Sequence, residues 1–468
     1  MSRKQTAGIV LGLLLPLIIL LYPGGLDMTA RLALALSAFT VLFWTFEPLP
    51  IEYTSLLILV LFPLLRVIPF ETAFAAFSGK AVWLVFSGLA LSLGITETPL
   101  GARLARLVLG RVGGYGRLIL GLHLLGLGMA LAVPSGVVRV LILMPMLVSL
   151  LKAMGEQPGS RVSAALILSL VCSTYYGGTG VLTGSVPNMV VLGVMESRKA
   201  PLYWSQWAFY LFPVIGLLRT GVCYLLIRWL FPVRPHPPPD PLPLPRERAG
   251  ETRALSTGLG EGEVITPAEK KVVGILLLGI LLWATDALHG VHPAYVGLFL
   301  VLLCYLPGWG PLPPDRLRGV NFPLLIYIAA VFTLGRALEA TGVTARLAAF
   351  LTGGLEGRDV LLQLGAITWT AALFDFLMDT AAVAGALTPA LLDFGAKIGL
   401  APLPVALSVA VGTGVVFLPY QAAPFVVAYS FRYVRMGQFL LMMILISLIT
   451  LLLLLPLNLL YWRLIGFV

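Results

Sequence analysis

Three ionisable side chains lie inside apolar stretches of the sequence. Arg139 follows the tripeptide Pro134-Ser135-Gly136, and Asp375 and Asp379 interrupt a second apolar stretch. An ionised side chain that faces lipid costs about 3 kcal/mol or more, so we expect all three to face a cavity. A guanidinium can hold a carboxylate or a sulfate through two parallel hydrogen bonds. The alternative for Arg139 is a structural ion pair with one of the two aspartates.

The two aspartates allow more than one interpretation. Asp379 could cap the helix that follows it, because Asp is a preferred N-cap residue. It would then occupy the positive helix end, and a cation, a proton or an amino group would suit this half better than an anion. Alternatively, a carboxylate in so dry a site could carry a proton and couple transport to protons in place of sodium. Asp375 lies four residues earlier and repels Asp379, which favours protonation of one of them.

The elements that hold these residues are predicted to be membrane helices. Of the 468 residues, 59% are hydrophobic and 11% are charged, against about 25% charged in an ordinary soluble protein. Most of the surface must therefore face lipid or other helices. The net charge of +10 comes mostly from short loops, which is typical of cytoplasmic loops and indicates no nucleic-acid partner. His289 and His292 form an isolated pair that we interpret as a loop in water, so no metal or cofactor is predicted.

One polar stretch divides the chain into two similar halves. Residues 98–105 and 341–348 are identical at five of eight positions, and residues 178–181 recur as 412–415. Matching halves indicate a transporter that is built from structural repeats. The predicted domains are an extra N-terminal helix at 1–29, repeat 1 at 30–231, a proline-rich cytoplasmic linker at 232–268, and repeat 2 at 269–468.

Arginine-rich loops predict the topology. Residues 99–117 carry four arginines and no acid, and the N-terminus and residues 429–437 are also basic, so all three should be cytoplasmic. This holds only if residues 118–153 and 360–396 enter and return as re-entrant hairpins. The prediction is an all-α polytopic membrane protein with eleven transmembrane helices, two re-entrant hairpins and two inverted-topology repeats of five spans plus an extra first helix. We expect the protein to lie in the inner or plasma membrane, with its N-terminus in the cytoplasm and its C-terminus on the extracytoplasmic side.

Each half also contains a long apolar segment that is interrupted in its middle. The segment 163–195 is broken at 177–188, and the segment 403–430 is broken at 417–424, in both cases by Gly or Pro. In a broken helix the half-helix N-termini attract anions and the freed carbonyls attract cations. We therefore expect the two hairpin tips and the two breaks to surround one site.

Three stretches resemble a known family. The sequence resembles the divalent anion:sodium symporters, which carry dicarboxylates, citrate and sulfate. The resemblance rests on residues 47–50 with the apolar run 56–65, on the run 177–188 and on the ending 456–466. The resemblance covers nearly the whole chain. It implies eleven spans, two re-entrant hairpins, inverted repeats and a homodimer whose transport domains move like elevators through the lipid bilayer.

The family's site motifs are only partly present. Each hairpin tip of the family carries Ser-Asn-Thr and each broken helix a Thr-Pro-Pro-Asn-like loop, whereas the first half here reads Ser135-Gly136-Val137 and Ser185-Val186-Pro187-Asn188. The second tip reads either Met378-Asp379-Thr380 or Asp379-Thr380-Ala381, and its break offers Gln421 without an asparagine. The predicted substrate-binding residues are Ser135, Gly136, Arg139, Ser185, Pro187, Asn188, Thr380 and Gln421. The predicted residues of a coupling-ion or proton site are Asp375, Asp379, Thr179 and Thr413.

The predicted function is secondary active transport of a small anionic solute, of the dicarboxylate, citrate or sulfate class, by elevator-type alternating access. The alternatives are a proton-coupled or uncoupled carrier of a zwitterion or cation and, more remotely, an intramembrane enzyme, for which no catalytic residues are predicted. We expect Ser135 to lie within contact reach of residues 185–188, and Arg139 and Asp379 to interact directly or through a solute. Because the asparagines are missing, we also expect transport that does not strictly depend on sodium.

Overall fold

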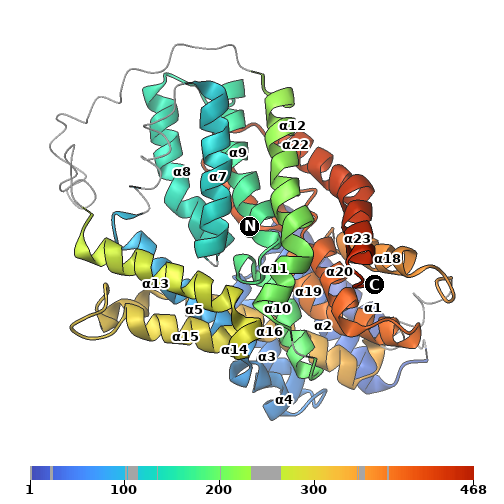
Figure 1. The fold of residues 1–468 in the computed structure, drawn as a ribbon. Coiled ribbons are helices and arrows are strands. Elements are labelled where there is room, and N and C mark those ends of the chain that lie inside the picture. Colours follow the sequence, from blue (N-terminus) through green and yellow to red (C-terminus); the bar gives the residue numbers. More distant parts are fainter. Residues whose placement is uncertain are drawn as a thin grey trace.

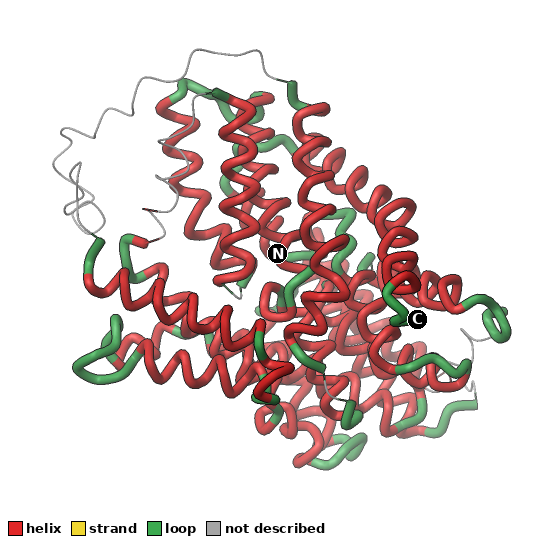
Figure 2. Tube along the Cα trace, in the orientation of Figure 1, coloured by secondary structure: helices red, strands yellow, loops and turns green. Residues whose placement is uncertain are grey.

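The computed structural model describes residues 3–21, 25–100, 103, 114–133, 135–200, 202–232, 265–344, 346, 354–376 and 379–468. This part of the chain consists of helices and connecting loops and contains no strand (Figure 2). Six of its helices are long and apolar enough to cross a membrane, or seven if the bent pair Phe70–Ser78 and Lys80–Thr96 is one span. The predicted tip residues Pro134 and Met378 and most of the predicted linker lie outside the described residues.

The first half of the chain runs through two groups of helices (Figure 1). The first group is α1 (Arg3–Leu21), α2 (Met28–Phe46), α3 (Ile51–Leu64), α4 (Phe70–Phe74) and α5 (Lys80–Thr96). The second group is α7 (Tyr115–Ala132), α8 (Gly136–Ala153), α9 (Arg161–Thr179), α10 (Val186–Ser197), α11 (Trp204–Leu211), a π-helical turn η3 (Phe212–Leu218) and α12 (Arg219–Leu230). Helix α9 packs against α7, α8 and α12, and all residues of its most apolar window are buried.

The second half repeats part of this order. It contains α13 (Pro267–Ala284), α14 (Asp286–His289), α15 (Pro293–Cys304), α16 (Phe322–Ala340), α18 (Val360–Phe374), α19 (Thr380–Lys397), α20 (Pro402–Thr413), α21 (Ala423–Ser430), α22 (Met436–Ile449) and α23 (Leu455–Leu464). Helices α18 and α19 follow one another closely along the chain, as α7 and α8 do, and α20 with α21 is interrupted like α9 with α10.

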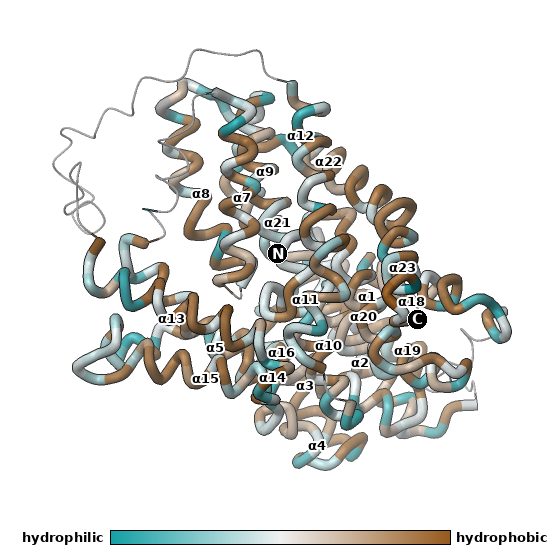
Figure 3. Tube along the Cα trace, in the orientation of Figure 1, coloured by the Kyte–Doolittle hydropathy of each residue, from teal (hydrophilic) through white to brown (hydrophobic). Residues whose placement is uncertain are grey.

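Apolar side chains cover the outside of the molecule as well as its core. Leu13, Leu17, Leu453 and Leu464 are more than half exposed on the outer helices, where Figure 3 shows strong hydropathy. Water would solvate such a surface poorly, whereas lipid chains would not, so these faces suit a bilayer. The chain is thus a multi-pass membrane protein.

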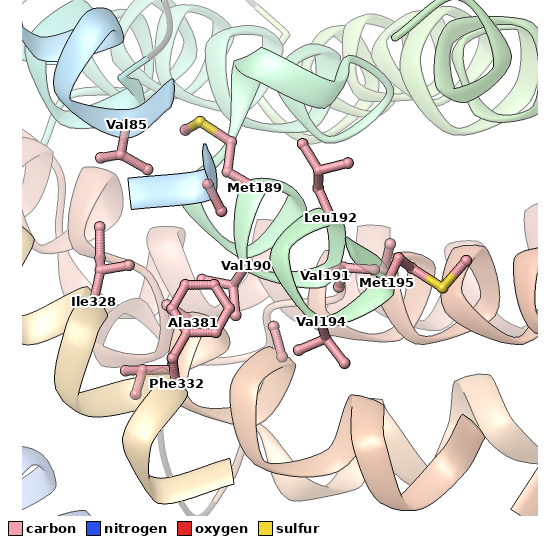
Figure 4. Close-up of a cluster of buried hydrophobic side chains, with 14 of the residues drawn as sticks. Val85, Met189, Val190, Val191, Leu192, Val194, Met195, Ile328, Phe332 and Ala381 are labelled. Carbon is pink, nitrogen blue, oxygen red and sulfur yellow. The ribbon is translucent and has the colours of Figure 1, made fainter. Parts of the chain in front are cut away.

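Helix α10 passes through the centre of the core. Val190 is buried and lies near Phe332 of α16 and Ala381 of α19, whereas Met189, also buried, lies on the side of Val85 of α5 (Figure 4). The contacts of α10 extend to α5, α16, α19 and α20, so elements from both halves surround it. Its N-terminus, which begins at the first break, is therefore held inside the protein and away from lipid.

The crossing of α16 and α19 depends on two glycines. A Cβ atom on Gly335 would lie 2.6 Å from the backbone carbonyl oxygen of Gly385, and a Cβ on Gly385 would lie 2.2 Å from a methyl carbon of Val331. Small residues allow membrane helices to approach closely and gain packing energy. Helix α19 is thereby fixed against α16.

We expect the substitution Gly335→Ala to lower the free energy of unfolding by about 1–3 kcal/mol, because the new methyl group meets backbone that cannot move aside. The control is Gly274→Ala in α13, where a Cβ would meet nothing within 4 Å. That control should be neutral, or more stable by up to about 1 kcal/mol. Thermal unfolding in detergent measures both variants, and equal melting temperatures would contradict the predicted crossing.

Candidate functional site

Two interrupted helices meet at the centre of the molecule. Between α9 and α10 lies the short 3-10 turn Leu182–Gly184, and between α20 and α21 lies the turn Pro419–Gln421. The two breaks touch, because a Cβ placed on Gly414 would lie 3.3 Å from the methyl carbon Cγ2 of Thr179. Pro187 stands in the first turn of α10, where its missing N–H breaks no helical hydrogen bond.

Amide side chains bind the backbone groups that the breaks release. The Nδ2 group of Asn188 donates to the carbonyl oxygens of Thr179 and Val181, at 3.1 and 2.9 Å. In the second half, the Oε1 atom of Gln421 accepts from the backbone N–H groups of Phe417 and Leu418, at 2.8 and 2.6 Å. These two predicted substrate ligands therefore hold the breaks in shape.

The two predicted threonines are also engaged by their own helices. The hydroxyl of Thr179 donates to the carbonyl of Tyr176 at 2.8 Å, and that of Thr413 donates to the carbonyl of Ala410 at 3.2 Å. Both hydroxyls bond to carbonyls in the last turn of a half-helix, and the carbonyl of Ala410 also accepts from the backbone N–H of Gly414 at 3.2 Å.

The first hairpin tip approaches both breaks. Ser135 caps α8 and accepts from the N–H of Val138 at 3.4 Å. A Cβ on the next residue, Gly136, would lie 2.8 Å from Pro424, so the first turns of α8 and α21 are in contact. The tip reaches the first break through Arg139, which donates from Nη2 to the carbonyl of Gly184, the residue directly before Ser185.

Arg139 is buried, with 1% of its surface exposed. Its guanidinium lies on the last turn of α9, where a Cβ on Gly178 would be 2.8 and 2.9 Å from two of its nitrogens, so a larger residue would displace it. Within the described ranges, Nε and Nη1 have no hydrogen-bond partner. No carboxylate of those ranges forms an ion pair with Arg139, so the direct interaction predicted with Asp379 is absent.

Three helix N-termini lie close together in this region, although Pro187 and Pro424 leave α10 and α21 with fewer free N–H groups than an ordinary helix start. Helix α8 has the long bond to Ser135, α10 begins at Ser185 without a side-chain cap, and α21 begins at Ala422, whose side chain cannot cap. A helix N-terminus carries about half a positive charge and binds anions. Together with Arg139, these N-termini, two from the first half of the chain and one from the second, make this region strongly positive.

The second hairpin tip has the opposite character. Asp379 caps α19, accepting from the N–H of Ala382 at 2.7 Å, as one interpretation of the sequence foresaw. The hydroxyl of Tyr327 on α16 also donates to this carboxylate, at 2.6 Å. Thr380 follows as the first residue of α19 and is buried. The positive end of α19 is therefore already occupied.

Asp375 is buried without a visible partner. It ends α18, none of its surface is exposed, and in the part of the chain that the structure describes neither carboxylate oxygen has a hydrogen-bond partner. The negative end of the helix dipole and the lack of water both disfavour its charge. Tyr175 on α9 is an electrostatic neighbour of Asp375 and connects the first break to this tip.

The structure adds a residue that we did not predict, Arg219. It is fully buried at the start of α12, donates from Nη2 to the carbonyl of Gly414 at 2.9 Å, and its guanidinium carbon lies 4.0 Å from the ring centre of Tyr176. The rule that identified Arg139, a charge within an apolar run, applies equally to Arg219. No sequence pattern indicates the role of Tyr327, because that role depends on its contact with Asp379, which is 52 positions away in the chain.

Comparison with known proteins identifies the family. The sequence model of the family described as "Sodium:sulfate symporter transmembrane region" matches residues 3–468. The L-tartrate/succinate antiporters of Escherichia coli K12 and Shigella sonnei are each 25% identical over 386 residues, covering 78% of this chain and 75% of the relative. The YdaH transporter of Alcanivorax borkumensis is similar over 99% of both chains, with 17% identity and a TM-score of 0.48. The chain therefore belongs to the sodium:sulfate symporter family, the divalent anion:sodium symporters, and is a transporter and not an enzyme.

Proposed function

We propose that the chain is a secondary active transporter of a small dicarboxylate. The observation that supports this most directly is the buried Arg139, which keeps two hydrogen-bond donors free where the N-termini of α8, α10 and α21 meet. A carboxylate would satisfy these donors and neutralise the charge at once. The relatives that are named L-tartrate/succinate antiporters support the dicarboxylate class over sulfate or citrate.

The transport cycle that we propose is of the elevator type. The units α7–α8 and α18–α19 would be re-entrant hairpins that move with the broken helices α9–α10 and α20–α21. The remaining helices would form the scaffold of a homodimer. The proposal keeps eleven spans in two inverted repeats, 30–231 and 269–468, with the linker and the N-terminus in the cytoplasm and the C-terminus outside. The similar order of helices in the two halves supports it.

Replacement of Arg139 tests the anion site. We expect Arg139→Lys to reduce uptake of radiolabelled succinate or tartrate into liposomes at least about tenfold, because each lost charge-assisted hydrogen bond is worth about 1.5–3 kcal/mol. Arg139→Gln should lose more. The matched control is Lys152→Gln at the exposed end of the same helix, which should transport normally. Wild-type uptake by a folded Arg139→Gln protein would reject this site.

Asp375 supports proton coupling as a second element of the proposed function. A buried carboxylate without a hydrogen-bond partner is more stable when it carries a proton, and release of that proton to one side of the membrane would couple transport to the proton gradient.

We expect an inward proton gradient to accelerate uptake by the wild-type protein, and Asp375→Asn to lose that acceleration while it still folds, because Asn has nearly the same shape. The control is Asp359→Asn, which changes the exposed N-cap of the same helix to an equally good capping residue. Uptake is measured with and without an imposed gradient. Proton coupling at Asp375 is refuted if the proton gradient does not change uptake by the wild-type protein, or if it still accelerates uptake by Asp375→Asn.

A further inference from the structure

Two buried arginines make the same contact at the two breaks. Arg139 donates from Nη2 to the carbonyl of Gly184 in the first break, and Arg219 donates from Nη2 to the carbonyl of Gly414 in the second. Their exposed fractions are 1% and 0%. In the described ranges neither guanidinium is paired with a carboxylate, and in both Nε and Nη1 have no hydrogen-bond partner.

Both guanidinium groups lie at the C-terminal ends of half-helices. Gly414 is the C-cap of α20, and Arg139 lies on Gly178 in the last turn of α9. A helix C-terminus carries partial negative charge and carbonyl oxygens without helical partners. In transporters with broken helices, these carbonyls are the places where a coupling cation binds. Here Arg219 already holds the carbonyl of Gly414 at the end of α20, and Arg139 holds the carbonyl of Gly184, which lies in the first break between α9 and α10.

The oxygen atoms near the breaks do not suit a second cation. A hard cation needs several oxygen ligands at fixed positions. The carbonyls of Thr179 and Val181 accept from Asn188, and the side-chain oxygen of Gln421 accepts from two backbone N–H groups. Repulsion by the fixed guanidinium charge disfavours sodium further.

We propose that Arg139 and Arg219 are tethered cations, which take the place of the sodium ions that the family name implies. The proposal rests on the proposed function, because it concerns the same anion site. A tethered cation compensates the charge of the bound anion and holds the broken helix in shape, but it cannot dissociate. A sodium gradient therefore cannot drive transport through these positions, and the driving force must come from exchange for another anion or from protons.

The first experiment uses the wild-type protein in liposomes at constant pH. Replacement of sodium by choline at equal ionic strength should change dicarboxylate uptake less than twofold, and it should leave the melting temperature of the purified protein unchanged. Uptake that disappears without sodium would overturn the inference while it leaves the proposed function intact. Absence of dicarboxylate uptake in either salt would instead refute the proposed function.

The second experiment removes one tethered cation and supplies a free one. Arg219→Ala leaves a cavity of the right shape, so it should lose at least tenfold in sodium-free uptake and recover at least threefold when guanidinium chloride is added at low millimolar concentration. Choline chloride should not rescue it. The matched control is Arg228→Ala on the same helix, an exposed arginine that donates to the hydroxyl of Tyr224, which should transport normally in every salt.

A melting temperature of Arg219→Ala that rises with guanidinium but not with choline separates charge replacement from general loss of structure. The inference is overturned if Arg219→Ala transports at the wild-type rate without guanidinium. It is equally overturned if a folded Arg219→Ala protein regains neither uptake nor melting temperature with guanidinium or with sodium.

Discussion

Every backbone group that a broken helix releases must find a partner inside the protein, because hydrocarbon offers none. This constraint applies twice at the centre of the molecule, at the ends of α9 and α20. Side chains supply the partners: the amides of Asn188 and Gln421 and the guanidinium groups of Arg139 and Arg219. Because two of these side chains are arginines, the residues that hold the broken helix ends in shape also determine the charge at the centre.

That charge differs between the two halves. The first half presents Arg139 with the N-termini of α8 and α10, whereas the second half presents the N-terminus of α21, which has no side-chain cap, and that of α19, which Asp379 already neutralises. Asp375 adds a carboxylate for which a proton is the natural partner. Two halves with a similar order of helices thus offer different chemistry, which is why we propose that the anion binds beside Arg139 and that Asp375 carries the proton.

Much of the arrangement follows from patterns in the sequence, and the rest depends on contacts between distant residues. Gly and Pro within apolar runs locate the interruptions at 177–188 and 417–424, because these residues release or block backbone hydrogen bonds. The N-cap role of Asp379, one of the alternatives that the sequence offered, also depends only on residues next to it in the chain. In contrast, the direct form of the predicted contact between Arg139 and Asp379 is absent from the described residues, because the rotation of each helix about its axis decides which way a side chain points, and packing sets that rotation. Contact between them through a solute stays a prediction. Solute binding by Asn188 stays a prediction, and the sequence did not reveal that its Nδ2 group binds carbonyls that only the folded break brings near.

The central claim, that a dicarboxylate binds to Arg139 at the meeting point of three helix N-termini, is tested most directly by imaging the ligand. A cryo-electron microscopy structure in lipid nanodiscs, with saturating succinate in sodium-free buffer, should show density for the anion against Arg139 and the first turns of α8, α10 and α21. The same preparation without succinate should lack it. Anion density elsewhere in the molecule, or an Arg139 that turns to form an ion pair with Asp375 or Asp379, would contradict the account.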